Sequence, residues 1–181
     1  KDCQLNIILL DADGKVVEKQ ETKARIGAKS LSEVPVELVL SAPRLWSPDM
    51  PYLYRAKIEV IAEGKTMDVY TNSVGVRSFE FTADKGFILN GKRLQLRGMC
   101  VHHDFGGLGI ALPDRANEKT VEVMKRMGCN LFRSSHNDAA PSLMEACDRL
   151  GLLVWAETRY LGLSNTAALP LRQFIRSNRN H

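Results

Sequence analysis

Long apolar runs are missing from this 181-residue chain: no uninterrupted apolar stretch approaches 18 residues. A helix that crosses a bilayer needs about 20 consecutive apolar residues. The N-terminal pattern of a secretory signal, a basic stretch followed by an apolar one, is missing as well. With 44% hydrophobic and 25% charged residues, the composition is typical of a globular protein, and we expect no membrane partner.

A strong excess of charge of one sign is also lacking. The chain has 25 Lys and Arg residues against 21 Asp and Glu residues, which leaves a formal net charge of +4. Proteins that bind nucleic acid gather their basic residues into a patch or stripe, whereas here they are scattered. We therefore expect no nucleic-acid partner.

Cysteine is scarce, and its spacing matches no common metal-binding or disulfide pattern. The four residues Cys3, Cys100, Cys129 and Cys147 form no C-x-x-C pair and no disulfide-dense spacing, which argues against a disulfide scaffold or a zinc ribbon. Cys100 and Cys129 lie in predicted strands and Cys147 in a predicted helix. We expect all of them to be reduced residues that pack in the interior.

Several catalytic motifs are absent too. No G-x-S-x-G elbow is present, so the serines at 134 and 135 do not suggest a serine hydrolase. The glycines at 106–109 lack the strand-to-helix context of a phosphate-binding loop. His102, His103, Asp104 and His136 could in principle bind zinc, but no H-E-x-x-H is present, and consecutive residues of a strand point to opposite faces. We expect no metal site.

What is present is a strand followed by a polar turn, three times over, between residues 87 and 157. The strands are predicted at 93–101, 129–133 and 152–156, and the polar turns begin at His102, Ser134 and Glu157. Helices are predicted between them at 114–127, with Asp114 as its N-cap, and at 142–150, closed by Gly151. Alternation of strand and helix indicates a parallel sheet with right-handed crossovers. A further helix is predicted at 168–178.

The first 83 residues have a different pattern, with short strands, turn residues and no helical periodicity. Strands are predicted at 5–10, 34–40, 52–62, 67–72 and 74–81. This spacing is typical of an immunoglobulin-like β-sandwich. After these strands, residues 87–94 have the pattern of a small hairpin with Asn90 and Gly91 at its turn. The predicted fold is multi-domain β plus α/β: a partial β-sandwich at 1–83, then the first three βα units of a TIM (β/α)₈ barrel at 84–181. Trp155 is expected to lie in the core, and Trp46 is expected to pack between the sandwich and the barrel; a platform for sugar is the alternative for both.

Six stretches, in the right order, resemble the glycoside hydrolase family 2 enzymes, which include β-galactosidases and β-glucuronidases. They are residues 45–54 (Leu-Trp-Ser-Pro-Asp-Met-Pro-Tyr-Leu-Tyr), 75–77, 89–98, 133–136 (Arg-Ser-Ser-His), 147–152 and 175–181. One departure is Cys100, where the family often has asparagine, and another is His103, where it often has an acidic residue.

The resemblance implies a retaining β-glycosidase that hydrolyses terminal β-linked sugars, with β-galactosidase as the first guess and no cofactor. It also implies that both catalytic glutamates lie beyond His181, so no catalytic residue is expected within the chain, which we expect to be an inactive internal fragment. His102 and His136 match positions that line the sugar subsite, and Arg133 would hold carboxylates in place.

Two strand-end acids, Glu157 and Asp104, complete the predicted substrate-binding set. Glu157 is expected to hydrogen-bond Arg133 or a sugar hydroxyl; the alternative is an ion pair without substrate contact. A non-enzymatic binding or spacer module is the competing interpretation of the whole chain. Because three parallel strands leave an open edge and an uncovered interior face, we also expect self-association.

Overall fold

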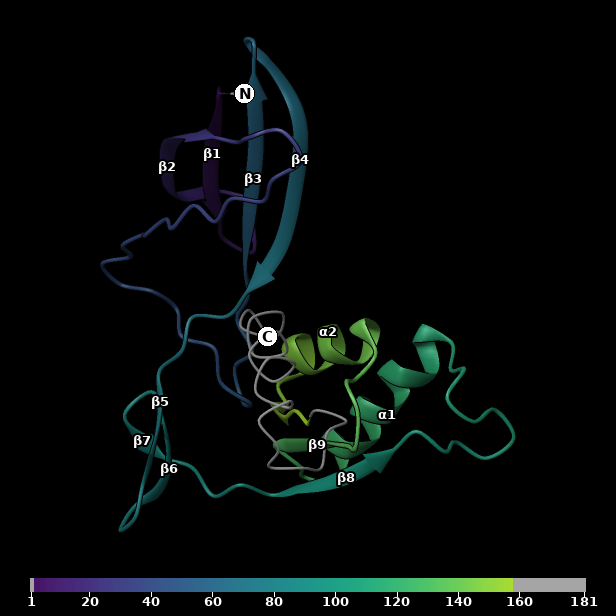
Figure 1. The fold of residues 1–181 in the computed structure, drawn as a ribbon. Helices are drawn as coiled ribbons and strands as arrows, with labels where there is room; N and C mark the ends of the chain where they lie inside the picture. Colours follow the sequence, from purple (N-terminus) through teal and green to yellow (C-terminus); the bar gives the residue numbers. More distant parts are fainter. Residues whose placement is uncertain (1, 158–181) are drawn as a thin grey trace. The chain divides into compact units, whose positions relative to one another are not determined.

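The computed structural model describes residues 2–157, which fall into two compact units (Figure 1). The first unit contains residues 2–44 and 52–76, and the second contains residues 45–51 and 77–157. The short segment 45–51 therefore belongs in space with the second unit, although the chain on both sides of it belongs to the first.

The first unit is a four-stranded antiparallel sheet with the order β2-β1-β3-β4. Its strands are β1 (Asp2–Leu10), β2 (Val16–Arg25), β3 (Tyr54–Ala62) and β4 (Lys65–Val74). The turn between β1 and β2 is closed by Asp11, whose carboxylate accepts hydrogen bonds from the backbone of Asp13 at 3.0 Å and of Lys15 at 2.8 Å. Ile7 and Leu9 on β1 are buried, so the central strands carry the apolar face.

Residues 34–40 form no strand, so the strand predicted there is wrong. The alternation that suggested it is real: residues 34, 36, 38 and 40 are half-buried, whereas 35, 37 and 39 are exposed. The segment lies outside the hydrogen-bonded ladders of the sheet, and Pro35 has no N–H to donate to one. Alternating burial shows only that one side of a segment contacts an apolar surface. A β-strand also needs a neighbouring strand to hydrogen-bond with, and alternation does not show whether there is one.

The second unit opens with a small antiparallel sheet of β5 (Phe79–Thr82), β6 (Gly86–Leu89) and β7 (Lys92–Arg93). β6 and β7 are joined by Asn90 and Gly91, both with positive φ, at 51° and 76°. Asn-Gly at such a two-residue turn matches the right-handed twist of a hairpin, and the predicted hairpin is confirmed. The strand predicted at 74–81 is wrong in extent, because β4 ends at Val74 and β5 begins only at Phe79.

A three-stranded parallel sheet follows, with the order β10-β9-β8. Its elements are β8 (Gly98–His102), α1 (Asp114–Arg126), β9 (Leu131–Ser135), α2 (Pro141–Leu150) and β10 (Leu153–Trp155). Both predicted helices are confirmed, except that Pro113 rather than Asp114 is the N-cap of α1. Gly151 closes α2 in the left-handed conformation, as predicted. The helix predicted at 168–178 lies outside the described residues.

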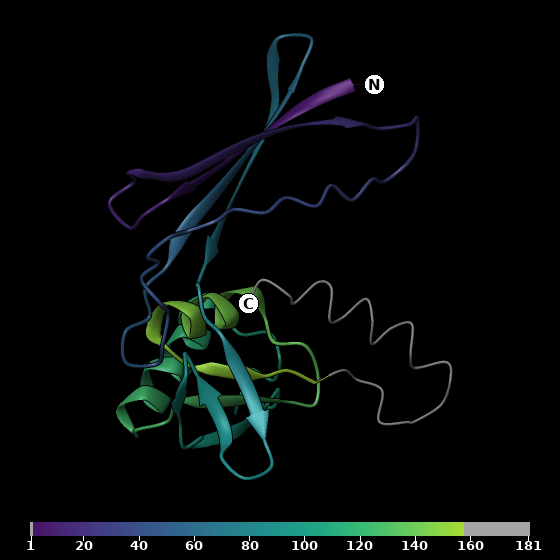
Figure 2. The same cartoon turned by 90° about the vertical axis from the view of Figure 1, so that its left-hand side faces the viewer.

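Figure 2 shows α1 and α2 together on one side of the parallel sheet, and the core of the unit lies between helices and strands. Val121 and Met124 of α1, Cys147 of α2 and Phe132 of β9 are at most 1% exposed. Val101 of β8 and the valine at 154 of β10 pack against the same cluster. Neither helix of the described part is long and apolar enough to cross a membrane.

The segment 45–51 is hydrogen-bonded to the carboxyl-terminal ends of α1 and α2. The Trp46 indole N–H donates to the carbonyl of Asp148 at 2.8 Å, and Lys125 Nζ bridges the carbonyls of Pro48 at 2.8 Å and Gly151 at 3.0 Å. Trp46 is only 2% exposed, which confirms it as a packing residue. Trp155, by contrast, is 60% exposed, so the prediction that it packs in the interior is wrong for the part of the chain that the structure describes.

Candidate substrate site at the strand ends

The register of the parallel sheet decides which side chains meet. Cys100 of β8 lies opposite Arg133 of β9, and Arg133 lies opposite Trp155 of β10. Successive side chains of a strand point to opposite faces. Because Phe132 of β9 packs against the helices, Arg133 and its two neighbours occupy the other face of the sheet, which in a barrel is the interior face.

Arg133 and Glu157 form the centre of the site. The guanidinium nitrogens Nε and Nη2 of Arg133 each lie 2.5 Å from Oε1 of Glu157. The second carboxylate oxygen, Oε2, lies 2.8 Å from Nδ1 of His136. The side chain of Glu157 is 16% exposed, so both of its oxygens are held in a partly buried place by two nitrogen-bearing groups.

These contacts lower the pKa of the Glu157 carboxyl below its ordinary value. The hydrogen bond from His136 is the main cause, the hydrogen bond and charge of Arg133 add to it, and partial burial opposes it. The carboxylate is therefore an anion over the neutral range and acts as a hydrogen-bond acceptor. A group held in this form is suited to orienting neighbours rather than to donating a proton.

Cys100 belongs to the same cluster, which the sequence did not predict. Nη1 of Arg133 lies 3.2 Å from its sulfur, and this hydrogen bond is the main cause that lowers the pKa of the thiol. Cys100 is exposed, so its prediction as a buried packing residue is wrong. Its position two residues before His102 on one strand is the signal that places both side chains on one face. Cys147 is buried as predicted, and burial raises its pKa to about 12.

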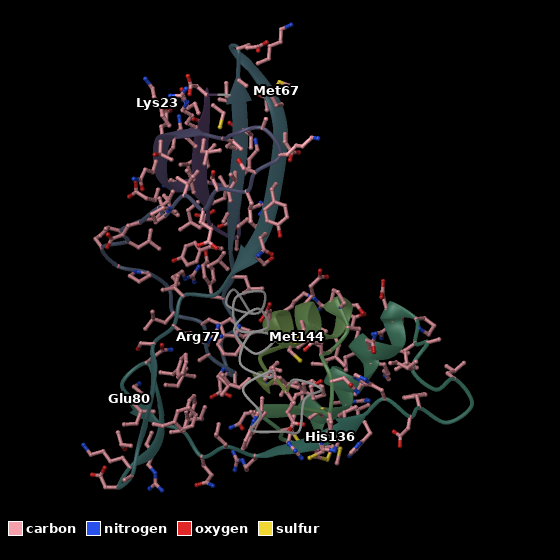
Figure 3. All side chains as sticks on the ribbon, in the orientation of Figure 1. Lys23, Met67, Arg77, Glu80, His136 and Met144 are labelled. Carbon is pink, nitrogen blue, oxygen red and sulfur yellow. The ribbon has the colours of Figure 1, made fainter. Side chains whose placement is uncertain are left out.

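His102 and His136 meet edge to face across the site. Their ring centroids are 5.2 Å apart and the ring planes cross at 75°. His102 ends β8, and His136 directly follows β9, where Figure 3 labels it. The peptide bond between Ser135 and His136 is cis. The structure thus brings together four of the five predicted residues: His102, Arg133, His136 and Glu157.

Asp104, the fifth predicted residue, follows β8 and is exposed. Within residues 2–157, no hydrogen bond or ion pair joins it to the cluster. The neighbouring His103 is half-buried, and its Nδ1 has no hydrogen-bond partner among the described residues. In the same part of the chain, no three His, Cys, Asp or Glu side chains are placed so that they could hold a metal ion.

The fold and the site together define a class of protein: a β-sandwich joined to the start of a (β/α)₈ barrel, with polar side chains gathered at the carboxyl ends of the barrel strands. Enzymes of this architecture bind their substrates at that face. Residues 1–77 match the family model described as Glycosyl hydrolases family 2, and residues 81–176 match the one described as Glycosyl hydrolases family 2, TIM barrel domain. The chain belongs to glycosyl hydrolase family 2.

Named relatives agree with this assignment. The chain is 43% identical to the β-galactosidase BoGH2A of Bacteroides ovatus, over 82% of this chain and 18% of the relative. It is 34% identical to a β-glucuronidase of Bacteroides fragilis, over 88% of this chain and 23% of the relative. A crystal structure of a glycosyl hydrolase family 2 member from Bacteroides cellulosilyticus superposes with a TM-score of 0.89 at 36% identity, covering 100% of this chain and 26% of that one. The chain therefore spans between 18 and 26% of the length of these relatives.

Proposed function

We propose that this chain supplies the sugar-facing part of a retaining β-glycosidase that hydrolyses terminal β-linked sugars. The observation that carries the proposal is the carboxylate of Glu157, held by Arg133 and His136 at the ends of two parallel strands, with His102 beside them. Each of these side chains can donate to or accept from a hydroxyl group. Asp104, exposed after β8, is the fifth member of the proposed substrate-binding set.

The chemistry of retention requires two carboxyl groups about 5–5.5 Å apart, one as acid and base and one as nucleophile. Glu157 is engaged through both oxygens, and its lowered pKa is unsuited to a general acid. We therefore assign it a supporting role and place the two catalytic glutamates of the family beyond His181. It follows that the purified chain alone should not hydrolyse a glycoside, and no cofactor is required.

A β-galactoside is our first choice of substrate. It is supported by the 43% identity to the Bacteroides ovatus β-galactosidase, compared with 34% for the Bacteroides fragilis β-glucuronidase. The competing interpretation, a spacer or a non-enzymatic binding module, offers no reason for ion-paired and hydrogen-bonded polar groups to gather at the ends of the strands.

The first test is binding, because it does not require turnover. The chain is titrated with D-galactose and with D-glucuronic acid, and the imidazole signals of His102, His103 and His136 are followed by NMR. We predict galactose-dependent shifts of His102 and His136. His103, which adjoins His102 but is not in the proposed substrate-binding set, serves as the internal reference. Equal shifts of all three, or none at saturating sugar, would count against a sugar site here.

The second test is catalysis. The purified chain is incubated with p-nitrophenyl β-D-galactopyranoside, and release of nitrophenolate is followed. We predict no release above the buffer rate. A rate that scales with chain concentration and is suppressed by a galactosidase inhibitor would show that the chain holds its own catalytic carboxyl groups.

A further inference from the structure

Asn130 lies at the opposite end of the parallel strands from the site, and its side chain is engaged at both polar atoms. Oδ1 accepts a hydrogen bond from the backbone N–H of Arg97 at 2.8 Å, and Nδ2 donates to the carbonyl of Gln95 at 2.9 Å. Asn130 is 7% exposed. A buried amide that satisfies its donor and its acceptor on a neighbouring segment fixes that segment in one position.

The backbone of Asn130 reaches the strands on both sides. Its N–H donates to the carbonyl of Arg97 at 2.8 Å, and its carbonyl accepts from the N–H of Leu153 at 2.9 Å. Asn130 immediately precedes β9, Arg97 immediately precedes β8, and Leu153 begins β10. One residue therefore touches the starts of all three strands.

Gly98 adds a steric condition at the same point. A Cβ atom on Gly98 would lie 2.3 Å from the carbonyl oxygen of Leu131, so only glycine lets β8 approach β9 this closely. From this start, the ladder pairs Gly98 with Leu131, Cys100 with Arg133 and His102 with Ser135. A slip of one residue would turn the side chains of one strand to the wrong face relative to the other.

We propose that Asn130 is a positioning residue that sets the register of β8 against β9 and thereby brings Cys100 and His102 to the face that holds Arg133 and Glu157. An ordinary buried asparagine would satisfy its own polar atoms. The side chain of Asn130 is satisfied by Gln95 and Arg97, which lie directly before β8. Its main-chain carbonyl also holds the first residue of β10, Leu153. The inference rests on the proposed function only in calling this face a substrate site.

The thiol of Cys100 reports the register without any sugar. Its contact with Arg133 crosses from β8 to β9, and Arg133 lowers its pKa, while burial and the Glu157 charge oppose the shift. The rate of alkylation by iodoacetamide follows the thiolate fraction. Mass spectrometry of the peptide that contains Cys100 separates its rate from those of the other three cysteines.

Two variants perturb the register in the complete chain. Asn130→Asp keeps the oxygen that accepts from Arg97 but replaces the amide donor to Gln95 with a second oxygen, and Gly98→Ala pushes β8 away from Leu131. In both, we expect the alkylation rate of Cys100 at pH 7 to fall several-fold and its pH midpoint to rise. Circular dichroism establishes that each variant is folded before its rates are compared.

The control is Val121→Ala, which removes packing from the core of the same unit, where Val121 of α1 is fully buried, and leaves every residue in the hydrogen bonds of Asn130 unchanged. It should lower thermal stability and leave the Cys100 midpoint unchanged. The proposal is overturned if folded Asn130→Asp keeps the wild-type midpoint, or if Val121→Ala shifts the midpoint as much. Loss of sugar-induced shifts in the NMR titration with a normal thiol midpoint would instead affect only the proposed function.

Discussion

Two nitrogens of Arg133 lie 2.5 Å from the same carboxylate oxygen of Glu157, across two neighbouring strands of a parallel sheet. Both side chains come from segments that end at the same edge, and a third strand brings Cys100 within 3.2 Å of the same guanidinium. Arg is suited to this task because its planar guanidinium donates in several fixed directions at once. The pair therefore fixes the geometry of the candidate site.

Acid stability should reveal this pair. The pKa of Glu157 is lower in the folded chain than in the unfolded one, so its contribution to stability is present above the unfolded pKa and is lost as the pH falls through the folded pKa. Glu157→Gln should therefore remove part of the loss of stability on acidification, measured as the melting temperature between pH 7 and pH 3. Glu145→Gln, at an exposed position of α2, is the matched control and should leave the profile unchanged. Parallel profiles for Glu157→Gln and wild type would refute the pairing.

Replacing glycine at the ends of the two helices separates backbone strain from steric clash. Gly128 and Gly151 have nearly equal φ, 82° and 83°, but a Cβ at Gly128 meets nothing within 4 Å, whereas one at Gly151 lies 2.3 Å from the carbonyl oxygen of Pro48. Gly128→Ala should cost about 1–2 kcal/mol from the left-handed conformation alone. Gly151→Ala should cost roughly a further 1–3 kcal/mol from overpacking. Urea unfolding measures both, and equal costs would show that segment 45–51 does not pack on Gly151.

Removing one hydrogen bond tests the same segment. Trp46→Phe keeps most of the buried ring but loses the donor to the carbonyl of Asp148, which should cost about 1 kcal/mol or somewhat more. Trp155→Phe, at an exposed position, provides the comparison and should leave the free energy of unfolding nearly unchanged. The reverse order of the two costs would contradict the structure.

The purified chain is expected to self-associate. On the same face of the parallel sheet as Arg133, Trp155 is 60% exposed, and within residues 2–157 the outer strands β8 and β10 each pair on one side only. Exposed apolar surface beside such edges favours association. We propose that two or more copies of the purified chain associate through this face. Sedimentation velocity over a range of concentrations should show a rising weight-average mass, reduced by Trp155→Ser. A compact monomer at every concentration would dismiss the idea.

Periodicity was sufficient to predict α1 and α2, and the Asn-Gly pair was sufficient to predict the hairpin of β6 and β7, because those signals are local. The alternation at residues 34–40 was misleading because it reports burial of one face, whereas a strand also needs a partner that the sequence does not name. The domain limits at 1–83 and 84–181 remain a prediction. A boundary drawn where the pattern changes near residue 83 does not show that segment 45–51 groups with the second unit, although Trp46 was expected to pack against the barrel.

For the site, the ends of successive parallel strands indicated which edge of the sheet to consider, since such ends share an edge. The resemblance to glycoside hydrolase family 2 then selected His102, Arg133 and His136 there, and Glu157 was selected as a strand-end acid. The place of Cys100 in the site was not predicted, because a cysteine in a strand is most often buried. Only the register, which sets Cys100 opposite Arg133, shows that it faces the site. The roles of Asn130 and Gly98 were equally hidden, because they depend on distances between strand starts rather than on residue type.

The most direct measurement is the sequence of the reading frame that encodes this chain, followed beyond His181. We predict a further barrel strand that ends in Asn-Glu, which would supply the acid and base, and a second strand-end glutamate further on as the nucleophile. A stop codon directly after His181 would contradict the glycosidase, and the polar cluster around Arg133 would then serve binding without hydrolysis.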